Sequence, residues 1–346
     1  MKTIHIGAIP VGPGHKPFII AEMSGNHNQS LERALAIVDA AAEAGAHAIK
    51  LQTYTPDTMT MVGALTISDP DSLWKNRELY DLYQEAYTPW EWHQAIFDRA
   101  HEKGMLAFSS PFDETAVDFL EKLQVPAYKI ASFENTDLPL LKKVAATGKP
   151  VIVSTGVATV SEVDEAVRTL KTHGCQDIIL LKCTSTYPAT PENTNLRTIP
   201  HLAQLFDVPV GLSDHTMGVG ASVAAVALGA SVIEKHFTLR RADGGVDSTF
   251  SLEPQELKLL VEESERAFLA LGDIQYGVQK AENKSRQFKR SIYVAQDLQA
   301  GDLFTKENLR VIRPNNGLEP KYLDQVLGKT AKTAIKAGTP LTWELL

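Results

Sequence analysis

The chain has 346 residues and a net charge of −8, and it is 44% hydrophobic and 22% charged, as in an ordinary globular protein. The negative charge argues against nucleic acid as the main partner, because affinity for a phosphate backbone comes from clustered Lys and Arg. No apolar run approaches the roughly 20 residues of a membrane span, and the first residues do not resemble a signal peptide, so we expect a cytoplasmic protein. The 2 cysteines, Cys175 and Cys183, match neither a zinc site nor a disulfide framework.

Between residues 17 and about 270, short β-branched runs alternate with amphipathic helical stretches. Strands are predicted at 18–23, 48–53, 106–110, 128–132, 151–155, 178–183, 210–214 and 232–237. Helices are predicted between them, among others at 31–43, 91–103, 116–123, 163–172 and 255–269. Eight such units in roughly 250 residues favour an α/β fold of the closed (β/α)₈ TIM-barrel type. An open doubly wound sheet is the alternative, and it is disfavoured because residues 23–28 lack the glycine fingerprint of that fold.

Two further segments depart from this alternation. Residues 54–89 form a connection longer than a typical βα loop, and such loops are often lids over a site. Trp74, Trp90 and Trp92 bracket this insertion, where either packing or stacking on a sugar would explain them. Residues 278–290 are polar and charged and indicate a linker between a barrel domain, 1–277, and a small domain, 291–346. The small domain would be marginal alone, so we expect it to dock elsewhere or to help form an oligomer.

Polar side chains mark the carboxyl ends of the predicted strands, which meet at one rim of a barrel where active residues gather. The lysines Lys50 and Lys129 lie within buried strands, and a buried lysine needs an anion. The other polar residues at these ends include Glu22, Gln52, Ser110, Ser132, Glu134, Ser154, Ser185, Tyr187, Ser213, His215, Glu234 and His236. The two lysines with Ser110, Ser132, Ser154 and Ser213 would surround a phosphate or carboxylate with charge-assisted donors.

Four residues at the rim suggest further chemistry. His215 and His236 end neighbouring strands and suit a divalent metal with open positions, although each could instead satisfy a backbone group in the core. Glu22 and Glu134 are candidates for acid–base work or for holding sugar hydroxyls, with a surface salt bridge as the alternative for Glu134. Away from the rim, Ser161 is predicted only to cap a helix.

The motifs taken together resemble the sialic acid synthase family. The series includes Asn26-His27-Asn28, Lys50-Leu51-Gln52-Thr53, Lys129-Ile130-Ala131-Ser132, Gly211-Leu212-Ser213-Asp214-His215 and Glu234-Lys235-His236-Phe237-Thr238. The resemblance implies a TIM barrel followed by an antifreeze-like SAF domain, in a domain-swapped homodimer. It also implies an enzyme that condenses phosphoenolpyruvate with an acylamino sugar aldehyde to form a C–C bond.

Within the family, residues 23–28 and 244–254 resemble the branch that makes pseudaminic acid, which implies 2,4-diacetamido-2,4,6-trideoxy-L-altrose as the sugar. N-acetylneuraminate and legionaminate synthesis are the alternatives. The resemblance implies that His215 and His236 hold a divalent metal, Mn²⁺ before Mg²⁺ or Co²⁺, and that Glu134 carries a proton. Phosphoenolpyruvate would be bound by Lys50, Ser110, Lys129, Ser132, Ser154 and Ser213, and the sugar by Glu22, Gln52, Ser185, Tyr187, Asp247 and Arg313.

Two functions of other kinds stay open. An aldolase of another type would form a Schiff base on Lys50 or Lys129 and would be insensitive to a chelator. A non-enzymatic carbohydrate-binding module would release no phosphate from phosphoenolpyruvate, and it leaves the polar strand ends unexplained.

Overall fold

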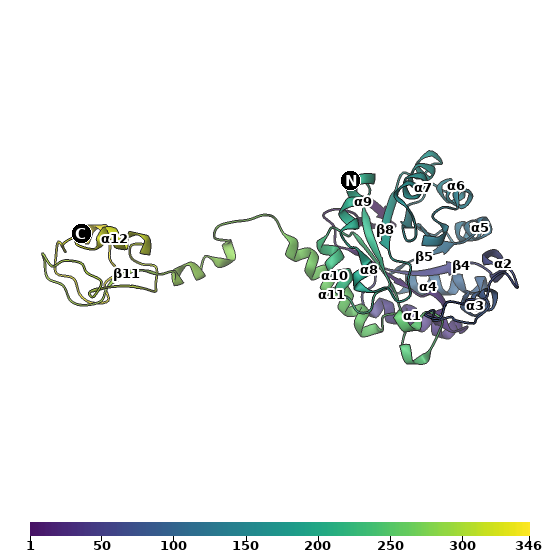
Figure 1. The fold of residues 1–346 in the computed structure, drawn as a ribbon, viewed down its shortest axis with the longest axis horizontal. Helices are drawn as coiled ribbons and strands as arrows, with labels where there is room; N and C mark the ends of the chain where they lie inside the picture. Colours follow the sequence, from purple (N-terminus) through teal and green to yellow (C-terminus); the bar gives the residue numbers. More distant parts are fainter. The chain divides into compact units, whose positions relative to one another are not determined.

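The computed structural model describes residues 1–346, which divide into two compact units, Met1–Gly272 and Asp273–Leu346. Eight parallel strands of the first unit close into a barrel in the order β10-β3-β4-β5-β6-β7-β8-β9 (Figure 1). They are β3 (Phe18–Glu22), β4 (Ala48–Thr53), β5 (Leu106–Pro111), β6 (Tyr128–Ile130), β7 (Val151–Ser154), β8 (Ile178–Cys183), β9 (Val210–Asp214) and β10 (Val232–His236). The predicted TIM barrel is confirmed, and each predicted strand matches to within two residues.

Helices form a layer around the barrel (Figure 1). They are α1 (Leu31–Glu43), α4 (His93–Glu102), α5 (Glu114–Lys122), α6 (Leu138–Ala145), α7 (Val160–Thr172), α9 (Thr198–Phe206), α10 (Gly220–Ala227) and α11 (Pro254–Leu271). In α7 the buried residues Val163, Ala166, Val167 and Leu170 recur at helical spacing and form the face that packs on the barrel. All the residues of β3, β7 and β9 are buried, as expected for parallel strands covered on both sides.

The start of α7 differs from the prediction that Ser161 is its N-cap. Thr159 caps the helix instead, because its hydroxyl accepts a hydrogen bond from the Glu162 amide at 3.3 Å. The Glu162 carboxylate in turn accepts one from the Thr159 amide at 2.6 Å, which completes a capping box. Ser161 lies in the first turn and is exposed.

The barrel interior is apolar in the layer beneath the polar strand ends. Phe108 shares a face of β5 with Ser110 and is fully buried, and Val232 lies two residues before Glu234 on β10 in the same way. Gly211 of β9 lies so close to β10 that a Cβ atom there would come within 2.3 Å of the Val232 carbonyl oxygen. The strands therefore approach closely here only because this residue has no side chain.

The two ends of the barrel carry different additions. An antiparallel hairpin, β1 (Ile4–Ile6) and β2 (Ile9–Val11), adds Ile4, Ile6 and Val11 to the main core. Its turn approaches Leu106 at the amino end of β5. At the opposite end, the insertion after β4 contains α2 (Pro56–Met59) and α3 (Leu79–Ala86), followed by a short 3₁₀ helix, Trp90–Trp92.

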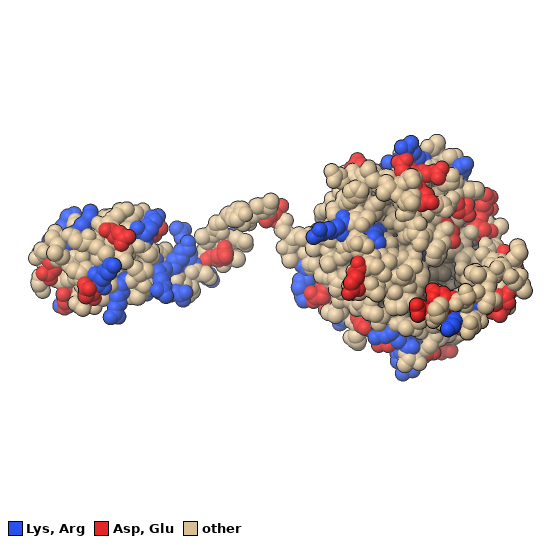
Figure 2. Space-filling model, in the orientation of Figure 1, with Lys and Arg blue, Asp and Glu red and all other residues tan.

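The second unit contains an antiparallel pair, β11 (Ser291–Val294) and β12 (Leu309–Ile312), and a short helix, α12 (Leu323–Val326). Its own small core includes Ile292, Phe304, Val326, Ile335 and Leu341. Lys and Arg gather on the segment before β11, at 280, 284, 286, 289 and 290 (Figure 2). None of the helices in the chain is both long and apolar enough to cross a lipid bilayer.

Candidate active site

Four charged side chains form a layer across the barrel interior at the carboxyl ends of the strands. We call Glu22, Lys50, Lys129 and Glu234 the charged floor, and none of these side chains is more than 7% exposed. The Lys50 ammonium lies 2.5 Å from Glu22 and 3.8 Å from Glu234, and the Lys129 ammonium lies 3.7 Å from Glu234. The lysines predicted to need an anion therefore pair with carboxylates of the chain itself, and Glu234 lies between them.

Serine hydroxyls extend this floor. Lys50 donates to Ser110 at 3.3 Å, Lys129 donates to Ser154 at 2.7 Å, and Ser213 donates to Glu234 at 2.9 Å. The buried Ser132 begins a short 3₁₀ helix, Ser132–Glu134, after β6. A Cβ atom at position 156 would come within 2.6 Å of the Ser132 hydroxyl and 2.1 Å of the Ser185 hydroxyl, so a glycine at 156 is what lets these two groups meet. All the residues predicted to hold phosphoenolpyruvate thus lie together.

Burial and mutual attraction perturb the floor's ionisation in opposite directions. Burial raises the pKa of Glu22 above its ordinary value, against the attraction of Lys50. Burial would also raise the pKa of Glu234, but the charges of Lys129 and Lys50 outweigh it and hold that pKa below the ordinary value. Burial lowers the pKa of Lys129, against the attraction of Glu234. An arriving anion would stabilise both ammonium groups, because it adds negative charge beside Lys129, whose burial outweighs the attraction of Glu234.

The two predicted histidines meet above the floor. The rings of His215 and His236 are 5.3 Å apart between centroids, and Phe250 packs 4.9 Å from His236. The Nδ1 atom of His215 lies 2.9 Å from the Thr184 carbonyl oxygen, so it carries the proton and its Nε2 is left free. Burial lowers the pKa of His236 well below its ordinary value. The Nδ1 atom of His236 is buried and has no hydrogen-bond partner.

These features fit a divalent metal at the histidine pair. A neutral imidazole with an unpartnered buried nitrogen is a ready ligand, and the Asp247 carboxylate lies 3.9 Å from that nitrogen. No group of three or more His, Cys, Asp or Glu side chains is arranged to hold a metal. A metal here would thus take two imidazole ligands and leave its other positions to substrate oxygens and water.

A cavity of about 390 Å³ opens beside the histidines and is covered by the insertion after β4. We call it the lid cavity. Its polar lining includes Ser24, Gln52, Ser185, Tyr187, His236 and Asp247, with Asp69 and Ser72 from the insertion. Much of the rest is apolar, including Met59, Ile67, Leu79, Leu82 and Phe112. Gln52 donates to Glu22 at 3.0 Å, which connects the polar side of the cavity to the charged floor.

The insertion is fixed over this cavity by Trp74. Its indole donates to the Val246 carbonyl oxygen at 3.0 Å, and its ring lies 5.8 Å from that of Tyr187. Trp90 does not line the cavity; it donates to the Tyr54 carbonyl oxygen and stacks on Phe119. Only one of these two tryptophans is therefore placed to meet a sugar.

Glu134 lies at the end of the 3₁₀ helix that starts at Ser132. Burial raises its pKa to about 7, although the nearby charge of Lys129 opposes the shift. Its Oε2 atom is buried without a hydrogen-bond partner, which argues against the surface salt bridge considered from the sequence. A carboxyl group with a pKa near neutral pH can accept or release a proton under working conditions.

Three contributors to the site escaped prediction. Ser24 bonds both Asp247 and Gln52, the Phe250 ring packs against both histidines, and Cys183 lies 3.6 Å from the Ser185 hydroxyl. Cys183 ends β8 on the interior face. The expectation that residues at the carboxyl ends of the strands gather at one rim could therefore have identified it, as it identified the serines. Arg313 follows β12 and belongs to the second unit.

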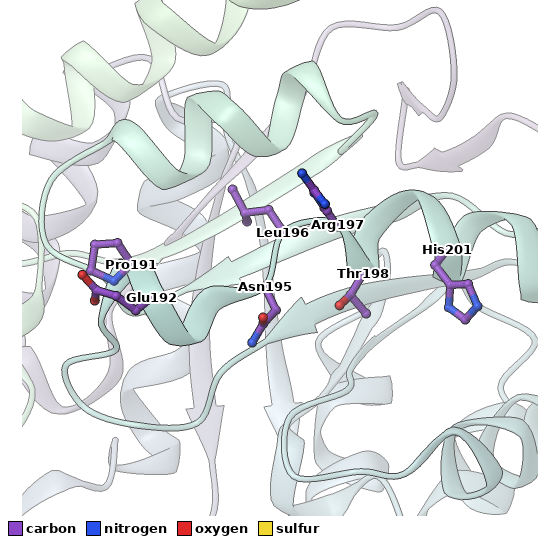
Figure 3. A pocket seen from close by; sticks show the side chains of 7 residues that line it. All are labelled: Pro191, Glu192, Asn195, Leu196, Arg197, Thr198 and His201. Carbon is purple, nitrogen blue, oxygen red and sulfur yellow. The ribbon is translucent and has the colours of Figure 1, made fainter.

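A separate, shallow depression of about 590 Å³ lies outside the barrel near α9 and the short helix α8 (Pro191–Thr194). Figure 3 shows the side chains that line it, from Pro191 to His201. It contains none of the residues at the strand ends and no buried charged group. The chemistry of the barrel therefore belongs to the rim and not to this surface.

Comparison with known proteins agrees with the geometry of the rim. Residues 37–276 match the model of the NeuB family, and residues 289–346 match that of the SAF domain. The chain belongs to the NeuB family. The predicted resemblance to sialic acid synthases with an SAF domain is thus confirmed.

Three relatives of this NeuB chain are informative. It is 46% identical to a pseudaminic acid synthase of Campylobacter jejuni, covering 94% of this chain and 95% of that protein. A pseudaminic acid synthase of Helicobacter pylori is 44% identical, with coverage of 94% and 96%. The crystal structure of an N-acetylneuraminic acid (sialic acid) synthetase from Leptospira borgpetersenii, in complex with citrate, superposes with a TM-score of 0.74 at 35% identity, covering 82% of this chain and 95% of that one.

Proposed function

We propose that this NeuB chain is a pseudaminic acid synthase. It condenses phosphoenolpyruvate with 2,4-diacetamido-2,4,6-trideoxy-L-altrose and water to give pseudaminic acid and phosphate. The observation that carries the proposal is the identity of 44–46% over 94% of the chain with two pseudaminic acid synthases, against 35% with the sialic acid synthetase. The site supports the same chemistry, because a charged floor for an anion adjoins a cavity that suits a sugar with methyl and acetamido groups.

The charged floor binds phosphoenolpyruvate. Lys50 and Lys129, with the hydroxyls of Ser110, Ser132, Ser154 and Ser213, donate to its phosphate and carboxylate oxygens. Both ammonium groups are already buried and held in place by Glu234, so they need little reorganisation when the anion arrives. This arrangement directs C3 of phosphoenolpyruvate toward the lid cavity.

The lid cavity holds the sugar as its open-chain aldehyde. Gln52, Ser185, Tyr187 and Asp247 orient its polar groups, and Glu22 fixes Gln52. A divalent ion, which we propose to be Mn²⁺ held by His215 and His236, supplies Lewis-acid polarisation of the aldehyde oxygen when bound. The apolar wall packs against the sugar's methyl and acetamido groups. C3 then forms the new C–C bond to the aldehyde carbon, whose oxygen takes up the electron pair of the C=O bond.

Glu134 acts at the step that follows. C–C bond formation leaves positive charge at C2, and water adds there while the Glu134 carboxylate accepts its proton. The resulting tetrahedral carbon expels phosphate with cleavage of the C–O bond. A base with a pKa of about 7 is suited to this transfer at neutral pH.

The second unit completes the proposal. We propose that the chain forms a domain-swapped homodimer in which Arg313 reaches the partner's sugar, where a guanidinium suits an acyl carbonyl. Support comes from the family resemblance and from the match to the SAF domain. Arg313→Ala should raise the KM for the sugar without changing the barrel's fold.

The decisive experiment measures phosphate release from phosphoenolpyruvate with a panel of sugars. We expect the altrose derivative to be preferred over N-acetylmannosamine and over the legionaminic acid precursor. A preference for either of the others would reassign the sugar and leave the chemistry intact. No phosphate release with any sugar would favour the carbohydrate-binding module, and borohydride trapping of Lys50 or Lys129 would favour the Schiff-base aldolase.

A further inference from the structure

A buried ion pair lies on the outer face of the barrel, behind the two histidines. Lys235 and Asp214 are directly opposite each other in the register of β9 and β10. The Lys235 ammonium is 3.1 Å from the Asp214 carboxylate, and the two side chains are 1% and 0% exposed. Because side chains alternate along a strand, the pair points away from the interior that receives Ser213, Glu234 and His236. It therefore takes no direct part in the proposed chemistry.

The pair connects three pieces of backbone. One carboxylate oxygen of Asp214 accepts from the Thr216 amide at 2.9 Å, and the other accepts from the Ser222 hydroxyl on α10 at 2.6 Å. The Lys235 ammonium also donates to the Thr216 carbonyl oxygen. Thr216 is thus bonded at both its N–H and its C=O, and it directly follows His215.

Each proposed metal ligand is adjacent in sequence to a member of this pair. His215 lies between Asp214 and Thr216, and His236 follows Lys235. We infer that Asp214 and Lys235 are positioning residues, which fix the ends of β9 and β10 so that the two imidazoles face one metal ion. The inference rests on the metal role assigned to the histidines under the proposed function.

Simple packing explains this pair less well. A buried ion pair usually adds little stability over an apolar pair of the same size, and it often costs some. Two apolar side chains could fill the same space, but they could not bond Thr216 at both of its backbone groups. Loss of the pair should therefore affect the geometry of the histidines more than the stability of the barrel.

The test uses the full chain carrying the neutral double substitution Asp214→Asn and Lys235→Met. We expect the variant to fold, as judged by circular dichroism and by a thermal midpoint near that of the wild type. Its Kd for Mn²⁺, measured by electron paramagnetic resonance, should rise by about tenfold or more. Its Kd for phosphoenolpyruvate, measured by calorimetry with a chelator present, should not change because the charged floor is intact. Lys149→Met is the control. Its ammonium lies 2.5 Å from the Glu121 carboxylate, and this ion pair is not adjacent to either histidine.

Each possible outcome of this test either supports or overturns the inference. A folded double variant that binds Mn²⁺ like the wild type overturns the inference, and so does a parallel loss of phosphoenolpyruvate affinity, which would indicate general loosening. If the double variant does not fold, Ser222→Ala decides: a Kd for Mn²⁺ raised by about threefold supports the inference, and an unchanged Kd overturns it. If His236→Ala binds Mn²⁺ as tightly as the wild type, the metal lies elsewhere and the inference fails, whereas the proposed function is judged separately by phosphate release.

Discussion

The charged floor and the lid cavity are neighbours built on opposite principles. The floor consists of strand residues with fixed directions, and its four charges are paired and almost fully buried. The cavity is formed mainly by loops and short helices and is largely apolar, with fewer polar groups. A small anion is recognised by charge and needs rigid donors, whereas a sugar with several substituents is recognised by shape. We therefore expect substitutions in the floor to affect phosphoenolpyruvate strongly and substitutions in the cavity to affect the sugar mildly.

The largest effect is expected at Glu134, where the two regions meet. Glu134→Gln should lower kcat by about 10²–10⁴-fold, because the glutamine cannot accept the proton of the attacking water. In the wild type, kcat/KM should rise with pH as Glu134 loses its proton near its pKa of about 7. This rise should be missing from the variant, while any limb due to phosphoenolpyruvate itself should remain. A wild-type profile that falls through pH 7 would instead make Glu134 a proton donor.

The second-largest effect is expected at Lys129 in the charged floor. Lys129→Met should lower kcat/KM for phosphoenolpyruvate by about 10²–10³-fold, because one preorganised donor to the anion is lost. Initial rates at saturating sugar measure this. Lys182→Met is the matched control. Lys182 lies on β8 and points away from the barrel interior, and its ammonium donates to the Thr184 hydroxyl at 2.8 Å. Equal losses in both variants would show that the floor has no special role.

The floor could be predicted from the sequence much better than the cavity. In a parallel barrel the strand ends share one rim and side chains alternate, so Lys50, Lys129 and Ser213 could be placed from their positions in the strands alone. The contact between Ser24 and Asp247 joins loops 223 residues apart, and no periodicity predicts it. The same holds for Trp74, whose partner is a carbonyl oxygen of another loop. Positions set by the strands were predictable, and positions set by packing between loops were not.

The charged floor should also contribute to the stability of the barrel, and Glu234 is the residue that tests this. Glu234→Gln removes the ion-pair partner of Lys129 and should lower the free energy of unfolding at pH 7 by about 3 kcal/mol. The depressed pKa of Glu234 means that its contribution is present above the ordinary value of 4.5 and is lost as pH falls through the folded-state value. The gap between variant and wild type, measured by urea denaturation, should therefore close in acid. Glu121→Gln, in a more exposed pair, should cost less than about 1 kcal/mol. Equal stability of both variants at pH 7 would contradict the view that the floor is a stabilised ion-pair layer.

The smallest effect is expected in the cavity, at Trp74. Trp74→Leu removes the bond to the Val246 carbonyl oxygen and the ring contact with Tyr187, each of which contributes about 1 kcal/mol or less. We expect the KM for the sugar to rise by about fivefold, while the KM for phosphoenolpyruvate stays the same because the floor is untouched. Trp90→Leu is the matched control: its indole also donates to a backbone carbonyl oxygen, at Tyr54, but it does not line the cavity. That control should lose stability without any change in the KM for the sugar. If Trp74→Leu raised both KM values together, the insertion would have to act on the floor as well, and the division between an anion site held by charge and a sugar site held by shape would fail.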